Sequence, residues 1–209
     1  ALAFHLALGQ PHAFSVFHLP LSTLVGIDQP AATAGKLSTI GWIFSPAIVF
    51  LGLSAFTFGR WLEEAGPRKA MFASAMCFAG GFFVAALGVQ LHQIWIIYLG
   101  YGVIGGIGLG LGYISPVSTL IKWFPDRPGM ATGLAIMGFG GGAMIGSPLA
   151  VALMAHFRTP KSVGVAEQFM VLGALYFVFM MFCVCTVRLP DSWWGLWGMK
   201  VGACATPWV

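Results

Sequence analysis

Six long stretches of the sequence contain no Lys, Arg, Asp or Glu. They run over Ala1–Ile27, Leu37–Phe58, Ala70–Leu91, Ile94–Ile121, Met130–Ala155 and Gln168–Val187. A helix needs about 20 mostly apolar residues to cross a bilayer, and in lipid it satisfies its own backbone hydrogen bonds. The sequence therefore predicts an all-α membrane protein. Residues 1–188 form a bundle of six transmembrane helices, and residues 189–209 form a Trp-rich cytoplasmic or interfacial tail.

The composition excludes the other broad classes. Charged residues make up 8% of the 209 residues and hydrophobic residues 58%, whereas soluble domains carry about 25% charged residues. Disordered chains are poor in apolar residues, so disorder is excluded as well. The net charge of +4 comes without a basic run, which gives no indication of nucleic-acid binding. The four cysteines form no CxxC pair, so we expect neither a metal site nor a cofactor.

The positive residues between the stretches indicate the orientation of the bundle. The connectors after the second, fourth and sixth stretches hold Arg60, Arg68, Lys69, Lys122, Arg127, Arg188 and Lys200. The other connectors hold Lys36, Arg158 and Lys161. Because cytoplasmic loops carry the excess of Lys and Arg, this bias of seven to three predicts that both ends of the bundle face the cytoplasm.

Glycine is concentrated in the fourth and fifth stretches at helical spacing. Glycines four residues apart leave bare backbone on one face of a helix, where a second helix can approach closely. The residues that we expect at such contacts, or at a bend beside them, are Gly106, Gly110, Gly133, Gly138, Gly142, Gly146 and Pro148.

The connector Gly59–Lys69 joins the second and third stretches, and in it an acid, Glu63, precedes two bases, Arg68 and Lys69, with a glycine at each corner. Glycine permits a tight turn, and a carboxylate can pair with a base. On these grounds alone, a charged loop that only sets topology is the simpler interpretation.

This connector resembles the signature between helices 2 and 3 of the major facilitator superfamily. Gly59, Glu63, Gly66 and Arg68 fall on its positions, followed by Lys69, although Glu63 replaces the more usual Asp. In that family the motif forms a latch that steadies one conformer, so the resemblance implies a gating role for these five residues. The fifth stretch, from Gly133 to Pro148, resembles in part the helix-5 motif of antiporters.

Three segments are similar to the oxalate/formate antiporter family: Gly9–Phe17, Gly59–Phe72 and Gly110–Pro148. The resemblance covers residues 1–190 and implies the N-terminal six-helix half of a secondary transporter, whose missing C-terminal half would be its partner. It also implies that helices 1, 2 and 4 line a central cavity. The polar or aromatic residues on those stretches are Gln10, His12, Phe17, Trp42, Tyr98, Tyr101 and Tyr113. Structural packing is the simpler interpretation of Trp42 and of the histidines.

We therefore expect a multi-pass protein of a bacterial inner membrane, without enzymatic activity, that exchanges small organic anions such as oxalate and formate. None of the six stretches holds a fixed positive charge, and a dicarboxylate is costly to dehydrate without one. The resemblance implies that the second half supplies those cations. A six-span intramembrane enzyme, a pore and a non-transporting membrane protein are the alternatives. A serine protease would need a Ser–His pair that we do not find, and charged filter rings for a pore are absent.

Overall fold

The computed structural model describes residues 2–17, 41–124, 126–157 and 164–188, and most residues in these ranges lie in helices. Five helical segments among them are long and apolar enough to cross a membrane. Their bounds are Phe44–Leu62, Pro67–Gln90, Ile94–Trp123, Pro128–Phe157 and Val165–Thr186. The second to sixth predicted spans thus have a counterpart. The first, Ala1–Ile27, lies partly outside the described residues.

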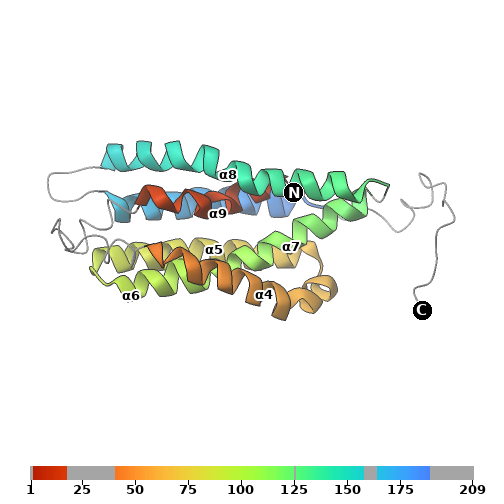
Figure 1. The fold of residues 1–209 in the computed structure, drawn as a ribbon, viewed down its shortest axis with the longest axis horizontal. Coiled ribbons are helices and arrows are strands. Elements are labelled where there is room, and N and C mark those ends of the chain that lie inside the picture. The colour runs from red at the N-terminus through yellow and green to blue at the C-terminus, as the bar shows by residue number, and fades with distance from the viewer. Residues whose placement is uncertain (1, 18–40, 125, 158–163, 189–209) are drawn as a thin grey trace.

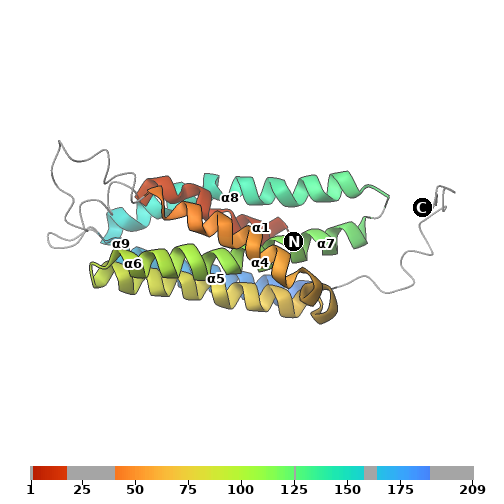
Figure 2. The ribbon, with the colours of Figure 1, turned by 60° about the horizontal axis from the view of Figure 1, so that its bottom comes forward.

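The helices follow one another along the chain in an up-and-down order. They are α1 (Leu2–Leu8), the 3-10 helix η1 (Gln10–Phe17), α4 (Phe44–Ala65), α5 (Pro67–Gln90), α6 (Ile94–Ile97), the π-helix η2 (Tyr98–Ile104), α7 (Gly105–Trp123), α8 (Pro128–Phe157) and α9 (Val165–Thr186). Figure 1 shows them aligned along the long axis of the molecule, with α8, α1 and α9 in one layer and α4, α5 and α6 in the other. The turned view in Figure 2 shows α4 running across the front of the bundle, below α1.

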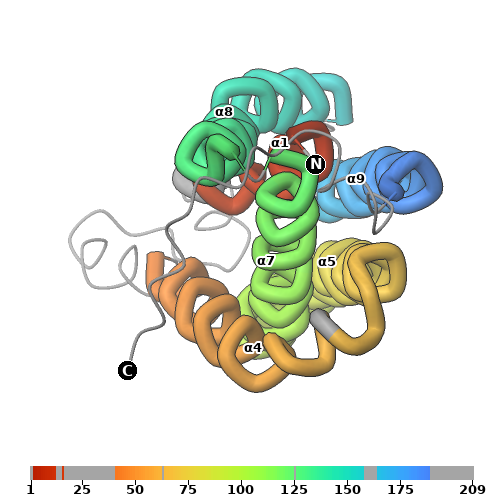
Figure 3. The backbone as a smooth tube through the Cα atoms, turned by 90° about the vertical axis from the view of Figure 1, so that its right-hand side faces the viewer, coloured from red at the N-terminus to blue at the C-terminus, as the bar shows by residue number. Residues whose placement is uncertain are grey.

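The end view in Figure 3 places α7 at the centre of the bundle, with α5 and α9 on one side and α4 and α8 on the other. The contacts agree with this view: α5 packs on α9 and α7, α4 packs on α7, and α1 with η1 packs on α8. The first span (α1) packs on the fifth (α8), and the fourth span (α7) packs on the second (α4). The two contacts are equivalent when spans one to three are matched with spans four to six. The bundle is therefore arranged as two related groups of three helices.

Glycines determine how closely α7 approaches its neighbours. A Cβ atom on Gly108 would lie 2.6 Å from the backbone nitrogen of Phe78 in α5, and one on Gly106 would lie 2.7 Å from the carbonyl oxygen of Ala47 in α4. A Cβ atom on Gly110 would clash with Ser54 of α4. Real Cβ atoms do not come this close, so the backbones meet directly.

On α8, the glycine contacts are directed at the first helix. A Cβ atom on Gly138 would lie 2.9 Å from the carbonyl oxygen of Leu2, and one on Gly142 would lie 2.6 Å from the Cα atom of Gly9. Gly133 differs from the expectation, because nothing in the described residues lies within 4 Å of a Cβ atom there. Pro148 lies within α8 and is exposed. The packing pattern predicted for this stretch thus begins one turn later than Gly133.

The second span ends later than predicted, and this changes the shape of the connector. Helix α4 continues through Gly59 to Ala65, so Gly59 is a helical residue rather than a corner. Only Gly66 makes the turn, with φ of 82°, a conformation that glycine adopts without strain. Charged side chains in the last turn of α4 do not end it, because they can reach the interface from a helix end.

All six basic residues in the described ranges lie at one end of the bundle. They are Arg60, Arg68 and Lys69 around the turn between α4 and α5, Lys122 in the last turn of α7, Arg127 just before α8, and Arg188 after α9. This is the end that the sequence predicts to face the cytoplasm. The tail predicted at 189–209 lies outside the described residues.

Candidate substrate-binding site

Two segments depart from α-helical geometry, and both carry predicted site residues. The 3-10 helix η1 contains Gln10 and His12, and the π-helix η2 contains Tyr98 and Tyr101. Runs of 3-10 helix this long are uncommon, and π-segments inside α-helices are often found at functional sites. The two irregular segments are therefore candidates for a functional site.

The segments meet through a buried hydrogen bond between η1 and η2. The Tyr101 hydroxyl donates to Oε1 of Gln10 at 3.4 Å, and both side chains are almost fully buried. The Nε2 atom of Gln10 is also buried and has no hydrogen-bond partner among the described residues. A buried donor without a partner costs about 1–3 kcal/mol. Gln10 thus holds an unused donor in the interior of the bundle.

A third helix reaches the same place through Tyr176 of α9. A Cβ atom on Gly146 would lie 3.5 Å from the Tyr176 hydroxyl oxygen and 3.5 Å from Cγ of Gln10. Gly146 therefore leaves room for both side chains beside α8. We call Gln10, Tyr101, Tyr176 and Gly146 the buried polar cluster. Sequence reasoning missed Tyr176, because a single Tyr in the sixth stretch carries no signal that sets it apart from packing.

His12 lies at a more open place, between α4 and α8. Its ring is exposed and meets the edge of Phe139 with centroids 4.8 Å apart and that of Phe44 at 6.0 Å. Phe139 in turn contacts Tyr113 at 5.3 Å, and the Tyr113 ring contacts His5 at 5.6 Å. We call these five residues the aromatic row. It joins His12 and Tyr113, which were predicted, to Phe44 and Phe139, which were missed because such residues are common on lipid-facing helices.

His5 forms the inner end of the aromatic row and is fully buried. Its Nε2 donates to the backbone carbonyl oxygen of Tyr113 at 3.2 Å. A carbonyl oxygen only accepts, so this bond fixes a proton on Nε2. His5 is thus a structural histidine that ties α1 to α7.

The remaining predicted residues do not join these groups. Trp42 precedes α4 and is 64% exposed. Tyr98 is half-buried and contacts Trp95 at 5.9 Å, at the opposite end from the basic residues. The side chain of Phe17 lies outside the described residues. The structure therefore brings together Gln10 with Tyr101, and His12 with Tyr113, as two neighbouring sets.

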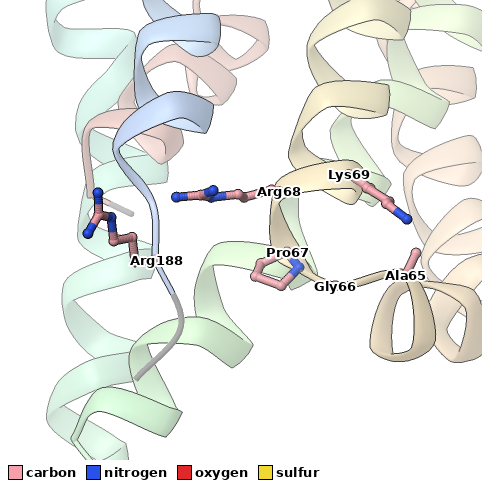
Figure 4. A pocket seen from close by; sticks show the side chains of 6 residues that line it. All are labelled: Ala65, Gly66, Pro67, Arg68, Lys69 and Arg188. Atoms are coloured by element: carbon pink, nitrogen blue, oxygen red, sulfur yellow. The ribbon is translucent and has the colours of Figure 1, made fainter. Parts of the chain in front are cut away.

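The predicted gate surrounds the turn between α4 and α5. Nε of Arg68 donates to the backbone carbonyl oxygen of Val187 at 2.7 Å, at the end of α9. Figure 4 shows Arg68 extending from the start of α5 toward this segment, with Lys69 directed toward the end of α4. The side chain of Glu63 lies outside the described residues, so a Glu63–Arg68 pair is not seen here. What is seen is an arginine that caps a neighbouring helix.

Two further side chains tie helix ends together at the same place. Ser115 of α7 donates to the Pro67 carbonyl oxygen at 3.2 Å, and Nε1 of Trp123 donates to the Arg188 carbonyl oxygen at 3.0 Å. Gly66, Arg68, Lys69 and Arg188 are among the residues that line a pocket of about 390 Å³ beside them. The turn is therefore fastened to both α7 and α9. We call the bonds of Arg68, Ser115 and Trp123 the helix-end clasp.

Comparison with known sequences identifies the family. The sequence model of the Major Facilitator Superfamily matches residues 14–196. The chain belongs to the major facilitator superfamily. Membership places it among membrane transporters rather than enzymes, and it agrees with an all-helical half built from two groups of three helices.

Several superfamily proteins are similar to this chain. The uncharacterized MFS-type transporter YhjX of Escherichia coli (strain K12) is 28% identical over 176 residues, which cover 84% of this chain and 40% of that protein. Apicoplast pyruvate carrier 1 of Toxoplasma gondii is 30% identical over 63% of this chain and 23% of its own length. The oxalate:formate antiporter of Oxalobacter formigenes is 29% identical over 64% of this chain and 30% of its own length. The chain thus spans less than half the length of these superfamily relatives.

Proposed function

We propose that this chain forms one half of a secondary transporter for small organic anions of the carboxylate class. The support is the meeting of η1 and η2 at the Gln10–Tyr101 hydrogen bond, beside the aromatic row. Two carriers among the relatives, the oxalate:formate antiporter and apicoplast pyruvate carrier 1, are named for small carboxylates. Exchange of oxalate for formate by alternating access is the specific activity that we propose to test first.

In this proposal the aromatic row forms the surface that the anion meets. Its rings exclude water, and the Tyr113 hydroxyl and the His12 ring provide hydrogen-bond donors. The buried polar cluster lies behind that surface, where Gln10 has a donor without a partner. A rotation of Gln10 would bring its amide toward the anion, and Tyr101 and Tyr176 would guide that rotation.

The second part of the proposal concerns charge. In the described residues, every Lys and Arg lies at one end of the bundle, and none lies beside the aromatic row. An unpaired carboxylate is costly to hold in such a place. We propose that a second six-helix half faces α4 and α8, closes the cavity and contributes fixed cations.

The third part concerns the gate, formed by Gly59, Glu63, Gly66, Arg68 and Lys69. We propose that it lies on the cytoplasmic face of a bacterial inner membrane, with both ends of the bundle on that side. The helix-end clasp would hold one conformer, because two of its bonds join the α4–α5 turn to α7 and to the end of α9, and the third joins α7 to Arg188 after α9. Opening of this side would break them.

Counterflow in liposomes tests the activity directly. The complete carrier, meaning this chain with the half that it pairs with, is reconstituted with unlabelled formate inside. Labelled oxalate is then added outside. We expect internal formate to stimulate uptake, and internal pyruvate serves as the second substrate arm. Uptake that is the same with and without an internal anion would indicate a pore, and no uptake under any condition would contradict the proposal.

A further inference from the structure

The open end of the aromatic row is a histidine with unusual surroundings. His12 is exposed between α4 and α8, and its ring nitrogens form no hydrogen bond with the described residues. Its neighbours are the rings of Phe44 and Phe139, which offer no donor or acceptor that could fix its protonation state. His5, in contrast, has its Nε2 bound to a carbonyl oxygen. His5 is fully buried and His12 is exposed, so of the two histidines in the row only His12 can exchange a proton directly with water.

The position of His12 along the bundle is far from other charges. Phe139, its closest ring neighbour, is the twelfth residue of the 30-residue α8. The titratable side chains of α8 are limited to His156, and those of α4 to Arg60, Glu63 and Glu64, all near helix ends. On α7 the nearest titratable group is the Tyr113 phenol, and on α1 it is His5. No described carboxylate or fixed cation therefore faces His12.

An imidazole in such a place can supply the positive charge that the described spans otherwise lack. An imidazole titrates near neutral pH, and an anion that contacts the ring stabilises its protonated form. We infer that the carboxylate is held by the protonated imidazolium of His12, so that each anion binds together with one proton. The proton comes from the water on the side to which the site is open. The inference rests on the proposed function, because it concerns the same site.

This arrangement makes anion affinity depend on pH in one direction. Below the pH at which His12 without a bound anion releases its proton, the affinity for the anion is constant. Above it, each anion must bring a proton with it, so the Kd rises by up to about tenfold per pH unit. A fixed Arg or Lys would give no such dependence in this range.

Calorimetry of the complete carrier tests the inference. Oxalate or formate is titrated between pH 5.5 and 8.5, and at the upper end of this range in two buffers of different ionisation enthalpy. The buffer dependence of the heat gives the number of protons taken up for each anion bound. We expect a value approaching one, together with the rise in Kd described above. His12→Gln should abolish proton uptake, and His12→Arg should restore binding without pH dependence.

His156→Gln is the matched control, because His156 also meets an aromatic edge, that of Phe157 at 5.2 Å, but lies at the end of α8. We expect it to keep both affinity and proton uptake. Thermal unfolding of each variant shows whether it is folded. A wild-type Kd that does not vary with pH, or proton uptake that persists in His12→Gln, would overturn the inference while leaving the transport proposal intact. Absence of binding by either anion at every pH would overturn the transport proposal itself.

Discussion

Glycine has different surroundings in the central helices, α5 and α7, and in the outer helices, α4 and α8. At the centre, 56% of the apolar window of α5 and of the α6–α7 span is buried, and glycines such as Gly81 and Gly108 touch the backbone of a neighbouring helix. On α4 and α8 the buried shares are 17% and 28%, and Gly52, Gly133 and Gly140 have nothing within 4 Å of a Cβ atom. Glycine content alone therefore does not identify a helix contact. The central glycines build the half, and the outer ones lie on faces that lipid or a second half can cover.

The sharpest test of this comparison places one methyl group on each side. Gly108→Ala would put a Cβ atom 2.6 Å from the backbone nitrogen of Phe78, so α5 and α7 must move apart. We expect the free energy of unfolding to fall by about 1–3 kcal/mol, as for other overpacked interiors. Thermal or denaturant unfolding in detergent measures the change.

Gly140→Ala is the matched control on the outer side. The new methyl group meets open space in the described bundle, and alanine favours a helix over glycine by about 1 kcal/mol. We expect unchanged or slightly increased stability. Equal losses in the two variants would show that the difference between the sides does not exist.

The second test concerns the buried polar cluster, which lies in the interior of the bundle. Gln10→Leu keeps the approximate volume of the side chain but removes the acceptor of the Tyr101 hydroxyl. We expect exchange to fall by about fivefold or more, since the loss of one hydrogen bond in a buried place costs about 1–3 kcal/mol. The initial rate of counterflow is the measurement.

Tyr101→Phe provides the partner for a double-mutant cycle with Gln10→Leu. If the two side chains act through the bond that joins them, the double variant should be little worse than either single variant. Fully additive losses would contradict a shared role, and the two residues would then be independent packing positions.

Much of the bundle could be predicted from the sequence, because charge and length define a span. The limits of the last four spans agree with the uncharged stretches to within a few residues, and glycines at four-residue spacing identified the contacts of Gly106 and Gly138. The turn at Gly66 was also predicted. The corner predicted at Gly59 was wrong, since a helix at the membrane interface continues through charged residues whose side chains reach water.

The site was less accessible to sequence reasoning. No short pattern in the sequence predicts the 3-10 geometry of η1 or the π geometry of η2. The contacts of His12 with Phe44 and Phe139 join residues that are 32 and 127 positions apart. In the sequence, Phe139 looks like any aromatic residue that faces lipid. Only the fold shows that it contacts His12 instead.

A third test concerns the end of the bundle, where the helix-end clasp joins the α4–α5 turn to α7 and α9. Arg68→Gln removes the donor to the Val187 carbonyl oxygen. We expect exchange to slow by about two- to fivefold, the effect of one partly exposed hydrogen bond, with membrane insertion unchanged. Arg60→Gln is the matched control, because Arg60 is an exposed basic residue at the same end outside the clasp. Equal rates for Arg68→Gln and the wild type would remove the gating role from Arg68.

The smallest effect is expected at Trp42, which is exposed just before α4. Its indole ring is 64% exposed and lies outside both the aromatic row and the buried polar cluster. A ring in this position adds to a binding surface only if the second half closes over it, so Trp42→Ala tests that closure. We expect the half-saturation concentration for exchange to rise by about twofold, corresponding to about 0.4 kcal/mol, with stability unchanged. A half-saturation concentration equal to that of the wild type would mean that Trp42 faces lipid, and the face between α4 and α8 that meets the anion would then be narrowed to the aromatic row.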